Sequence, residues 1–423
     1  MSSSRVGSAS ARHSVSADAR SSPVETASAF DISRNVASTI VDTIAELDRE
    51  GSSLSAIHAA EHLAPRQPRS VAGRLSAVDR FLPAWILIAM AAGLALGRIW
   101  PSLGTLIGRW QIQQVSIPIA IGLLLMMYPI LARVRYERTA DAAKDWRMLG
   151  MSLVMNWIVG PAFMFALAWL LLSDQPALRT GVILVGLARC IAMVLVWNQL
   201  ASGDAEYAAV LVALNAVFQI VGYAGLAVFY LNVLPGWLGL HGQSINVNAG
   251  TVAVSVGIFL GVPLVAGLVT QLVLVHRKGR SWYEATFIRR TSRLTLIGLL
   301  FTIVVMFALQ GHTITSAPLT VARVMLPLLA YFAGMFFVAF FGAWALRFSY
   351  EKATTLGFTA ASNDFELAIA VAVTVFGVQS AQALGAVIGP LVEVPVLLGL
   401  VYVALWTRYR LFPGYARPGD VAA

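Results

Sequence analysis

Four titratable side chains and one thiol lie inside segments of the sequence that are otherwise strongly apolar. Arg189 and Cys190 are neighbours in one segment. Asp364 and Glu366 lie two residues apart in a second segment, and Glu393 stands in a third, between two prolines. An ionisable side chain inside a membrane span costs about 2.5–3.5 kcal/mol on insertion scales, so such residues are candidates for function by default. These five residues are therefore the candidate site.

Cys190 is the sole cysteine of the chain. A single cysteine excludes an internal disulfide and any cysteine-built metal cluster within one chain, and we predict no metal site and no cofactor. A thiolate is a ligand for soft metals and metalloids, and a single thiolate gives a bond that can form and be released. The alternative is that Cys190 is a small, inert packing residue.

The carboxylates suggest proton chemistry. Glu366 is the strongest candidate, because an acid in a low-dielectric segment can take up and release a proton. Arg189 could form a buried ion pair with Asp364 or Glu366, or it could contact a substrate. Glu393 could satisfy backbone groups freed by the adjacent prolines instead of moving protons. We assign supporting roles in binding or proton coupling to Arg189, Asn363, Asp364 and Glu393.

The elements that must position these residues are membrane helices. The 423 residues are 58% hydrophobic and only 12% charged, and the mean hydropathy is +0.74. Soluble proteins carry about 25% charged residues, so a water-facing surface is excluded and a lipid bilayer is the expected environment. The net charge is +9, but the basic residues lie mostly in short loops, which indicates membrane topology and not nucleic-acid binding.

Ten apolar segments are long enough to be spans, and they predict an all-α polytopic membrane protein. They are 81–98, 115–132, 148–172, 177–200, 206–231, 249–275, 294–310, 321–346, 354–376 and 386–407. We predict three regions: a Ser/Arg-rich cytoplasmic extension, disordered to partly helical, over 1–72; a ten-span transporter domain over 73–410; and a short cytoplasmic tail over 411–423.

Lys and Arg residues set the expected orientation. Most of those in loops fall on one side, in 133–147, in 277–293 and at Arg347 and Lys352. The positive-inside rule places that side, and with it both termini, in the cytoplasm of a cell whose plasma membrane holds the protein.

Comparable landmarks recur about 170–175 positions apart, as at Met148 and Ala322. Five spans followed by five spans predict two inverted repeats, a device of transporters whose site lies near the bilayer midplane. At this spacing Cys190 corresponds to a position beside Glu366. The small polar run 361–364 predicts a break in the ninth helix, and the fourth helix should be broken likewise.

Several runs, taken in order, resemble the signature of the Acr-type arsenical-resistance permeases. They are 186–194, 196–198, 211–215, 218–219, 358–370 and 389–395, and the resemblance covers essentially all of 75–410. It implies the ten-helix fold of the bile acid/sodium symporters and export of arsenite, sometimes antimonite, in exchange for protons. It also implies that Cys190 and Glu366 bind substrate.

The chain departs from this pattern at Asp364, where the family commonly has asparagine, and the family has no counterpart of residues 1–72. The first alternative function is a sodium-coupled organic-anion symporter of the same fold. A second alternative is a membrane enzyme with Cys190 as nucleophile, but the sequence has no histidine within any span to act as the base. A third alternative is a non-transporting receptor that uses residues 1–72 as a signalling arm. The chain lacks an ATP-binding Gly-x-x-x-x-Gly-Lys-Ser/Thr loop, so coupling to an ion gradient is the default.

Overall fold

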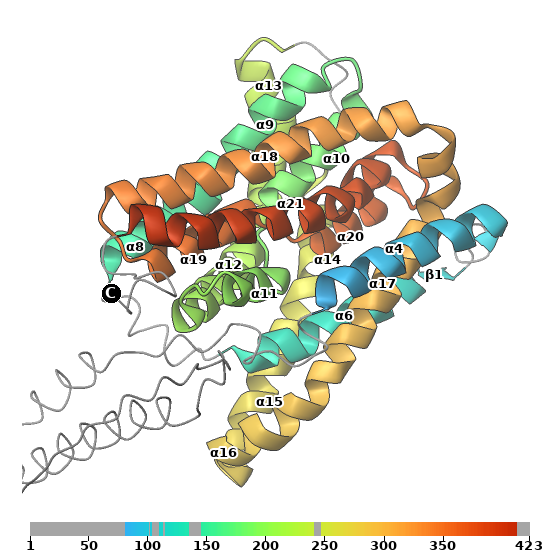
Figure 1. Ribbon diagram of the computed structural model, residues 1–423. Helices are drawn as coiled ribbons and strands as arrows, with labels where there is room; N and C mark the ends of the chain where they lie inside the picture. The colour runs from blue at the N-terminus through green and yellow to red at the C-terminus, as the bar shows by residue number, and fades with distance from the viewer. Residues whose placement is uncertain are drawn as a thin grey trace, which may run out of the picture. The chain divides into compact units, whose positions relative to one another are not determined.

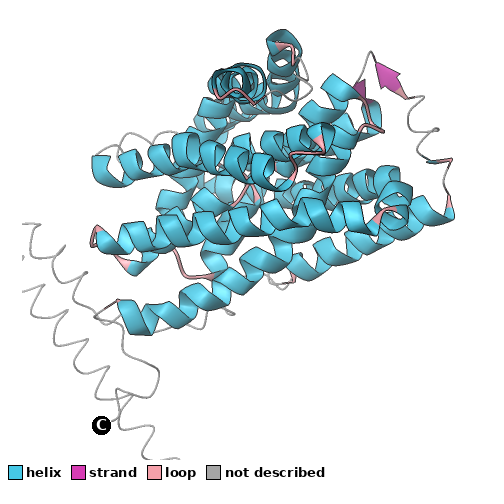
Figure 2. Ribbon diagram, turned by 90° about the horizontal axis from the view of Figure 1, so that it is seen from above, coloured by secondary structure: helices cyan, strands magenta, loops and turns pink. Residues whose placement is uncertain are grey.

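The computed structural model describes residues 81–100, 102–103, 110–112, 115–134, 145–240 and 247–412. These residues belong to one compact unit, Ser70–Ala423. The predicted extension over 1–72 and nearly all of the predicted tail over 411–423 lie outside the described residues. Helices make up almost the whole of the described chain, apart from a short hairpin of β1 (Gln111–Ile112) and β2 (Val115–Ser116) (Figures 1 and 2).

A first group of helices packs around α17. The group contains α4 (Leu82–Ile99), α6 (Ile117–Arg133), α14 (Ala249–Val256), η5 (Gly257–Gly261), α15 (Val262–Lys278), α16 (Arg280–Trp282), η6 (Tyr283–Ile288) and α17 (Arg289–Ser316). Helix α17 packs along α4 and α6, and α15 packs against the other side of α6. Figure 1 shows α15 and α17 running together to α16 at the end of this group.

A second group contains the remaining helices. They are α8 (Trp146–Val154), η3 (Met155–Val159), α9 (Gly160–Leu171), α10 (Pro176–Leu187), α11 (Met193–Leu200), α12 (Ala205–Val228), η4 (Phe229–Val233), α13 (Leu234–Trp237), α18 (Pro318–Ala345), α19 (Tyr350–Ala361), α20 (Phe365–Phe376) and α21 (Ala381–Leu411). Helix α18 packs on α9, α19 and α21, while α10 packs on α20 and α21.

Each of the ten predicted apolar segments coincides with a helical stretch. Among the described residues, seven stretches are long and apolar enough to cross a membrane: Leu82–Ile99, Trp146–Leu171, Ala205–Trp237, Ala249–Lys278, Arg280–Ser316, Pro318–Ala345 and Ala381–Leu411. The apolar helices α6, α10 and α20 are shorter. The protein is thus an all-helical membrane protein, as its composition predicts.

Three of the long helices widen for one turn just before a proline. The π-helical turns η3, η4 and η5 end two residues before Pro161, Pro235 and Pro263 respectively. Proline has no N–H group and its ring clashes with the carbonyl four residues earlier. A wider turn relieves that clash, so each helix continues through the proline instead of ending.

Helices α19 and α20 lie in the interior of the second group. All residues from Phe365 to Thr374 are buried, as are all from Ala353 to Ala361. Helix α20 also reaches the first group, because it packs on α14 and approaches α6 and η5. At one end of this boundary, Gln310 of α17 donates to the Val378 carbonyl (2.6 Å), and Gln379 donates to the Leu309 carbonyl (3.4 Å). The two groups therefore meet at α20, and also where α12 packs on α14 and where α21 packs on α4 and α17.

Candidate functional site

Two unwound segments cross inside the second group. Helix α10 ends at Leu187 and α11 begins at Met193, while α19 ends at Ala361 and α20 begins at Phe365. The break predicted over 361–364 is confirmed, and the fourth segment is broken as well. The two segments pair antiparallel with Arg189 opposite Asn363. The Cys190 N–H donates to the Ser362 carbonyl (3.3 Å), and the Asp364 N–H donates to the Ala188 carbonyl (3.1 Å).

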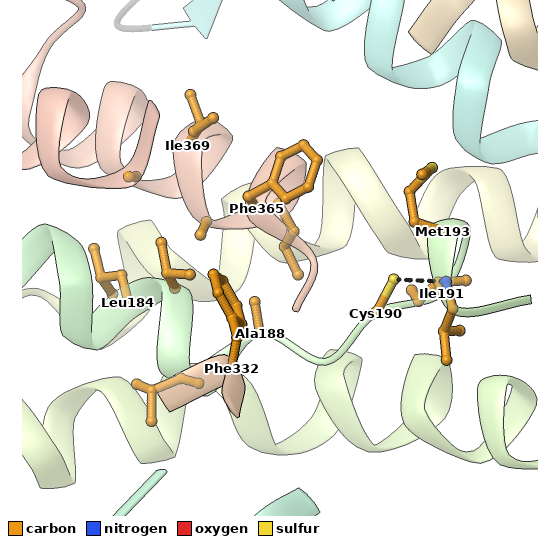
Figure 3. Close-up of a cluster of buried hydrophobic side chains, with 14 of the residues drawn as sticks. Leu184, Ala188, Cys190, Ile191, Met193, Phe332, Phe365 and Ile369 are labelled. Atoms are coloured by element: carbon orange, nitrogen blue, oxygen red, sulfur yellow. Dashed lines mark hydrogen bonds between the residues drawn. The ribbon is translucent and has the colours of Figure 1, made fainter. Parts of the chain in front are cut away.

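Cys190 accepts a hydrogen bond from the first turn of α11, and Asp364 accepts one from the first turn of α20. The four helices that end or begin at the unwound segments, α10, α11, α19 and α20, are called the half-helices. The Val194 N–H donates to Cys190 Sγ (3.3 Å; dashed line in Figure 3). The Leu367 N–H donates to Asp364 Oδ1 (3.0 Å). A helix N-terminus has unpaired N–H groups and a partial positive charge, which stabilises a thiolate or a carboxylate there. Both side chains therefore occupy the start of a helix.

The Arg189 guanidinium contacts the C-terminal ends of α10 and α19, the two half-helices that precede the unwound segments. It donates to the Gly186 carbonyl at the end of α10 and to the Ala360 carbonyl at the end of α19 (3.4 Å). Helix C-termini carry partial negative charge, so one buried cation compensates both. Among the described residues the hydrogen-bond partners of this guanidinium are carbonyls, whereas the sequence left open an ion pair with Asp364 or Glu366 or a contact with substrate.

Gln219 of α12 fixes the backbone of the crossing. Its Oε1 accepts from the Arg189 N–H (2.9 Å), and its Nε2 donates to the Arg189 carbonyl (3.0 Å). On the other side, Asn363 Nδ2 donates to the Val185 carbonyl (2.6 Å). The unwound backbone therefore finds hydrogen-bond partners without water, as buried polar groups require.

Three carboxylates surround the crossing, and all three are buried. Ser362 Oγ donates to Glu393 Oε1 (2.5 Å), so Glu393 lies against the broken segment. Helix α21 continues through both Pro390 and Pro395. Asp364 Oδ2, Glu366 Oε1 and Glu393 Oε2 have no hydrogen-bond partner among the described residues. A buried polar oxygen without a partner is costly, so these atoms are the ones that a proton or a substrate could satisfy.

Asp364 also reaches the boundary between the two helix groups. It lines a narrow space together with Leu367 of α20, Leu123 and Met127 of α6, and Phe259 and Leu260 of η5. This space has no room for a water molecule. Asp364 is therefore in contact with the surroundings of both helix groups.

Two residues that the sequence did not single out complete the surroundings of Arg189. The Tyr331 ring lies 5.8 Å from Arg189 Cζ, and its buried hydroxyl has no partner among the described residues. Gly160 leaves room for both side chains. A Cβ at that position would come within 2.8 Å of Arg189 Nη1 and 3.1 Å of the Tyr331 hydroxyl. The Gly160–Pro161 pair inside an apolar segment was the signal that could have pointed here.

The described residues contain no group of three His, Cys, Asp or Glu side chains that could hold a metal ion. The chemistry that the site offers is therefore one soft thiol and three carboxylates, held on a backbone that is fixed from both sides.

The chain is similar in sequence to known proteins. The model of the sodium/bile acid symporter family matches residues 120–317. The arsenical-resistance protein Acr3 of Corynebacterium glutamicum is 51% identical over 347 residues, which cover 82% of this chain and 94% of that protein.

Two further relatives match a similar share of the chain at lower identity. Acr3 of Alkaliphilus metalliredigens is 33% identical over 349 residues, covering 80% of this chain and 95% of the relative. An uncharacterized transporter of Synechocystis sp. is 34% identical over 356 residues, covering 80% and 91%. Since these relatives are 33–51% identical over at least 80% of the chain, the chain belongs to the Acr3 family of arsenical-resistance proteins and is a membrane transporter, not an enzyme.

Proposed function

We propose that the protein exports arsenite, and also antimonite, across the cytoplasmic membrane in exchange for protons, and so confers arsenical resistance. The observation that carries the proposal is the crossing itself. It brings the sole thiol of the chain opposite Ser362, at a backbone pairing surrounded by buried carboxylates with unpartnered oxygens.

Cys190 would make the bond to arsenic. Arsenous acid and the thiol exchange to give an arsenic–sulfur bond and a molecule of water: one As–OH bond breaks, and the leaving hydroxide takes the thiol proton. The Val194 N–H group that bonds Sγ holds the sulfur at the start of α11 for this step. A single sulfur ligand forms a bond that water can reverse, which suits release on the far side.

Glu366 would alternate between a proton and the substrate. An antiporter needs a site that cannot hold both ligands at once, because otherwise the two fluxes are not coupled. The unpartnered Oε1 of Glu366 can accept either a proton or a hydroxyl hydrogen of the substrate. Asn363, Asp364, Glu393 and Arg189 would support the site by shaping its charge and fixing its backbone.

The proposed architecture is ten spans in two inverted five-helix repeats, with both termini in the cytoplasm. The antiparallel pairing of Arg189 with Asn363 supports this, because such a pair has a local two-fold axis. The two broken segments that meet there are the fourth and ninth of the chain. The basic loops 133–147 and 277–293 support the orientation.

Everted membrane vesicles provide the test. We expect arsenite uptake to require an imposed pH gradient, acid inside, and to be unaffected by sodium. Collapse of the gradient with a protonophore should abolish uptake.

The symporter-family match favours one other function, sodium-coupled transport of an organic anion. Uptake that depends on sodium and ignores the pH gradient would replace our proposal with that one. Arsenite uptake in neither condition would refute both the cargo and the coupling.

A further inference from the structure

The helical hairpin formed by α15, α16, η6 and α17 carries several basic side chains near its turn. Arg277 and Lys278 lie in the last turn of α15, and Arg289, Arg290 and Arg293 lie in the first turns of α17. All five side chains are exposed. Figure 1 shows α15 and α17 running toward α16 at the turn of this hairpin. We call these five residues the basic hairpin end.

The basic hairpin end has no carboxylate partner among the described residues. The single acid between His276 and Arg293 is Glu284, and it pairs with Arg280 (3.1 Å). Of the five, Lys278 has an aromatic partner, because its Nζ lies 4.2 Å from the centre of the Trp282 ring. Five positive charges are thus left for a partner outside the described chain.

An exposed apolar band adjoins these charges on the same two helices. Leu272 of α15 is 66% exposed and Ile297 of α17 is 60% exposed. Val273 and Leu294 are exposed as well. Ile297 lies one helical turn, about 5–6 Å, beyond Arg293 along the axis of α17. The surface therefore passes from apolar to cationic within about one turn.

This gradient matches one class of partner. A soluble anion or a nucleic acid would be attracted by the charges but has no use for the apolar band. An anionic phospholipid fits both parts, since its phosphate pairs with arginine guanidinium groups and its acyl chains cover apolar side chains. Trp282 sits among the basic residues, as tryptophan does at membrane–water interfaces.

The hairpin end is also held firmly, so the charges keep their arrangement. The Tyr283 hydroxyl donates to the Ala132 carbonyl at the end of α6 (2.7 Å), and Arg133 donates to Ser292 of α17. Arg289, Ser292 and Arg293 share one face of α17, because residues three and four apart are neighbours on a helix.

We propose that the basic hairpin end is a binding site for anionic phospholipid headgroups, with the acyl chains lying along the exposed faces of α15 and α17. The site is distinct from the crossing of the unwound segments, and it does not depend on which substrate is transported.

The test measures lipid binding by the full chain, purified in neutral detergent, so that orientation in a membrane does not matter. Phosphatidylglycerol is titrated and its binding is followed by native mass spectrometry, with phosphatidylcholine as the neutral probe. For the double variant Arg289→Gln/Arg293→Gln we expect phosphatidylglycerol affinity to fall about 25-fold, since each basic residue near an anionic headgroup contributes about fivefold.

Two matched variants give the controls. Arg289→Lys/Arg293→Lys keeps the charges and should lose much less affinity. Arg347→Gln/Arg410→Gln removes two exposed arginines of the other helix group and should bind phosphatidylglycerol like the unmodified protein. Equal binding by Arg289→Gln/Arg293→Gln and the unmodified protein would overturn the proposal. So would displacement of the lipid by millimolar inorganic phosphate, which would indicate a site for soluble anions.

Discussion

Cys190 and Asp364 hold matching places on the two unwound segments. Each directly follows a member of the Arg189–Asn363 pair, each donates its N–H across the pairing, and each accepts a hydrogen bond from the half-helix that follows. The thiol and the carboxylate thus both accept a hydrogen bond from the start of a half-helix. A substitution can therefore change the chemistry of either group while it keeps this hydrogen bond.

Cys190→Ser separates the sulfur from the helix contact. A serine oxygen can still accept from the Val194 N–H, so the variant should fold and reach the membrane. It should lose arsenite export by more than about tenfold, which corresponds to at least about 1.4 kcal/mol of lost interaction. Transport in vesicles and protein abundance are the measurements. Resistance at the normal level would mean that the sulfur is only a packing group. Cys190→Ala should lose export and about 1 kcal/mol of helix-end stabilisation as well.

Glu366→Gln mimics a permanently protonated side chain. We expect it to insert normally but to lose proton-driven export, and arsenite should no longer release protons from the purified protein. Glu366→Asp keeps the charge but retracts it by one methylene, so partial activity with an altered pH optimum is expected. Glu393→Gln should cost less, because the amide oxygen can still accept from Ser362 Oγ. The opposite ranking, with full transport by Glu366→Gln and none by Glu393→Gln, would exchange the two roles.

Asp364→Asn removes one titratable group and preserves the helix contact. Asparagine and aspartate are about equally good at a helix N-terminus, so stability should change by less than about 0.5 kcal/mol. The change removes a carboxylate whose Oδ2 is unpartnered. We therefore expect transport to persist with a shifted pH dependence, measured as rate against pH in vesicles. An unchanged pH profile would show that Asp364 carries no proton. Asp364→Ala, which loses the contact, should be less stable by about 1 kcal/mol.

Gly160→Ala tests the packing around Arg189. The added Cβ would lie 2.8 Å from Arg189 Nη1, so the buried guanidinium must move. We expect a loss of about 1–3 kcal/mol in stability, typical of overpacking, together with impaired transport. Gly150→Ala is the matched control, because it lies in the same helical stretch with no atom within 4 Å of the new Cβ. Equal melting temperatures for the two variants would contradict this account.

Asp145 and Lys352 form a pair outside the spans, with Oδ2 and Nζ 2.6 Å apart. Burial alone raises the pKa of Asp145, but hydrogen bonds from Lys352 and the Met148 N–H outweigh it and leave the pKa below 3.8. A depressed carboxyl pKa gives stability that is present above the unfolded value and lost as the pH falls through the folded value. Asp145→Asn should therefore lower the melting temperature at pH 6 but have little effect near pH 3. The energy involved is no more than about 1 kcal/mol. An equal effect of the substitution at both pH values would exclude the ion pair as its cause.

The helices could be predicted because long apolar runs have few other structures open to them in a bilayer. The break before Phe365 could be predicted from small polar residues. The break between Leu187 and Met193 is much less visible in the sequence, since apart from Arg189 that run is apolar and has no glycine or proline. Its unwinding follows from pairing with a segment more than 170 residues away.

The sequence predicts candidate residues for the site but does not predict which of them contact one another. A repeat spacing read from loop positions is uncertain by a few residues, so Cys190 was matched to a position beside Glu366, whereas the pairing matches it to Asp364. The partners of Arg189 could not be predicted, because backbone carbonyls are present at every position and leave no trace in the sequence.

The pairing of the two unwound segments limits how the site could move. Backbone hydrogen bonds, the Gln219 bonds and the Arg189 contacts tie all four half-helices to one another. If a path to the site opened by separation of these half-helices, several buried polar groups would lose their hydrogen-bond partners at once. Sliding α20 and its attached helices past α14, α6 and η5 would keep the hydrogen bonds of the crossing, and the bonds that it would break include those of Gln310 and Gln379 across the boundary. The substrate would then move together with the helices that bind it. Their position relative to the first helix group would determine which side of the membrane the site faces.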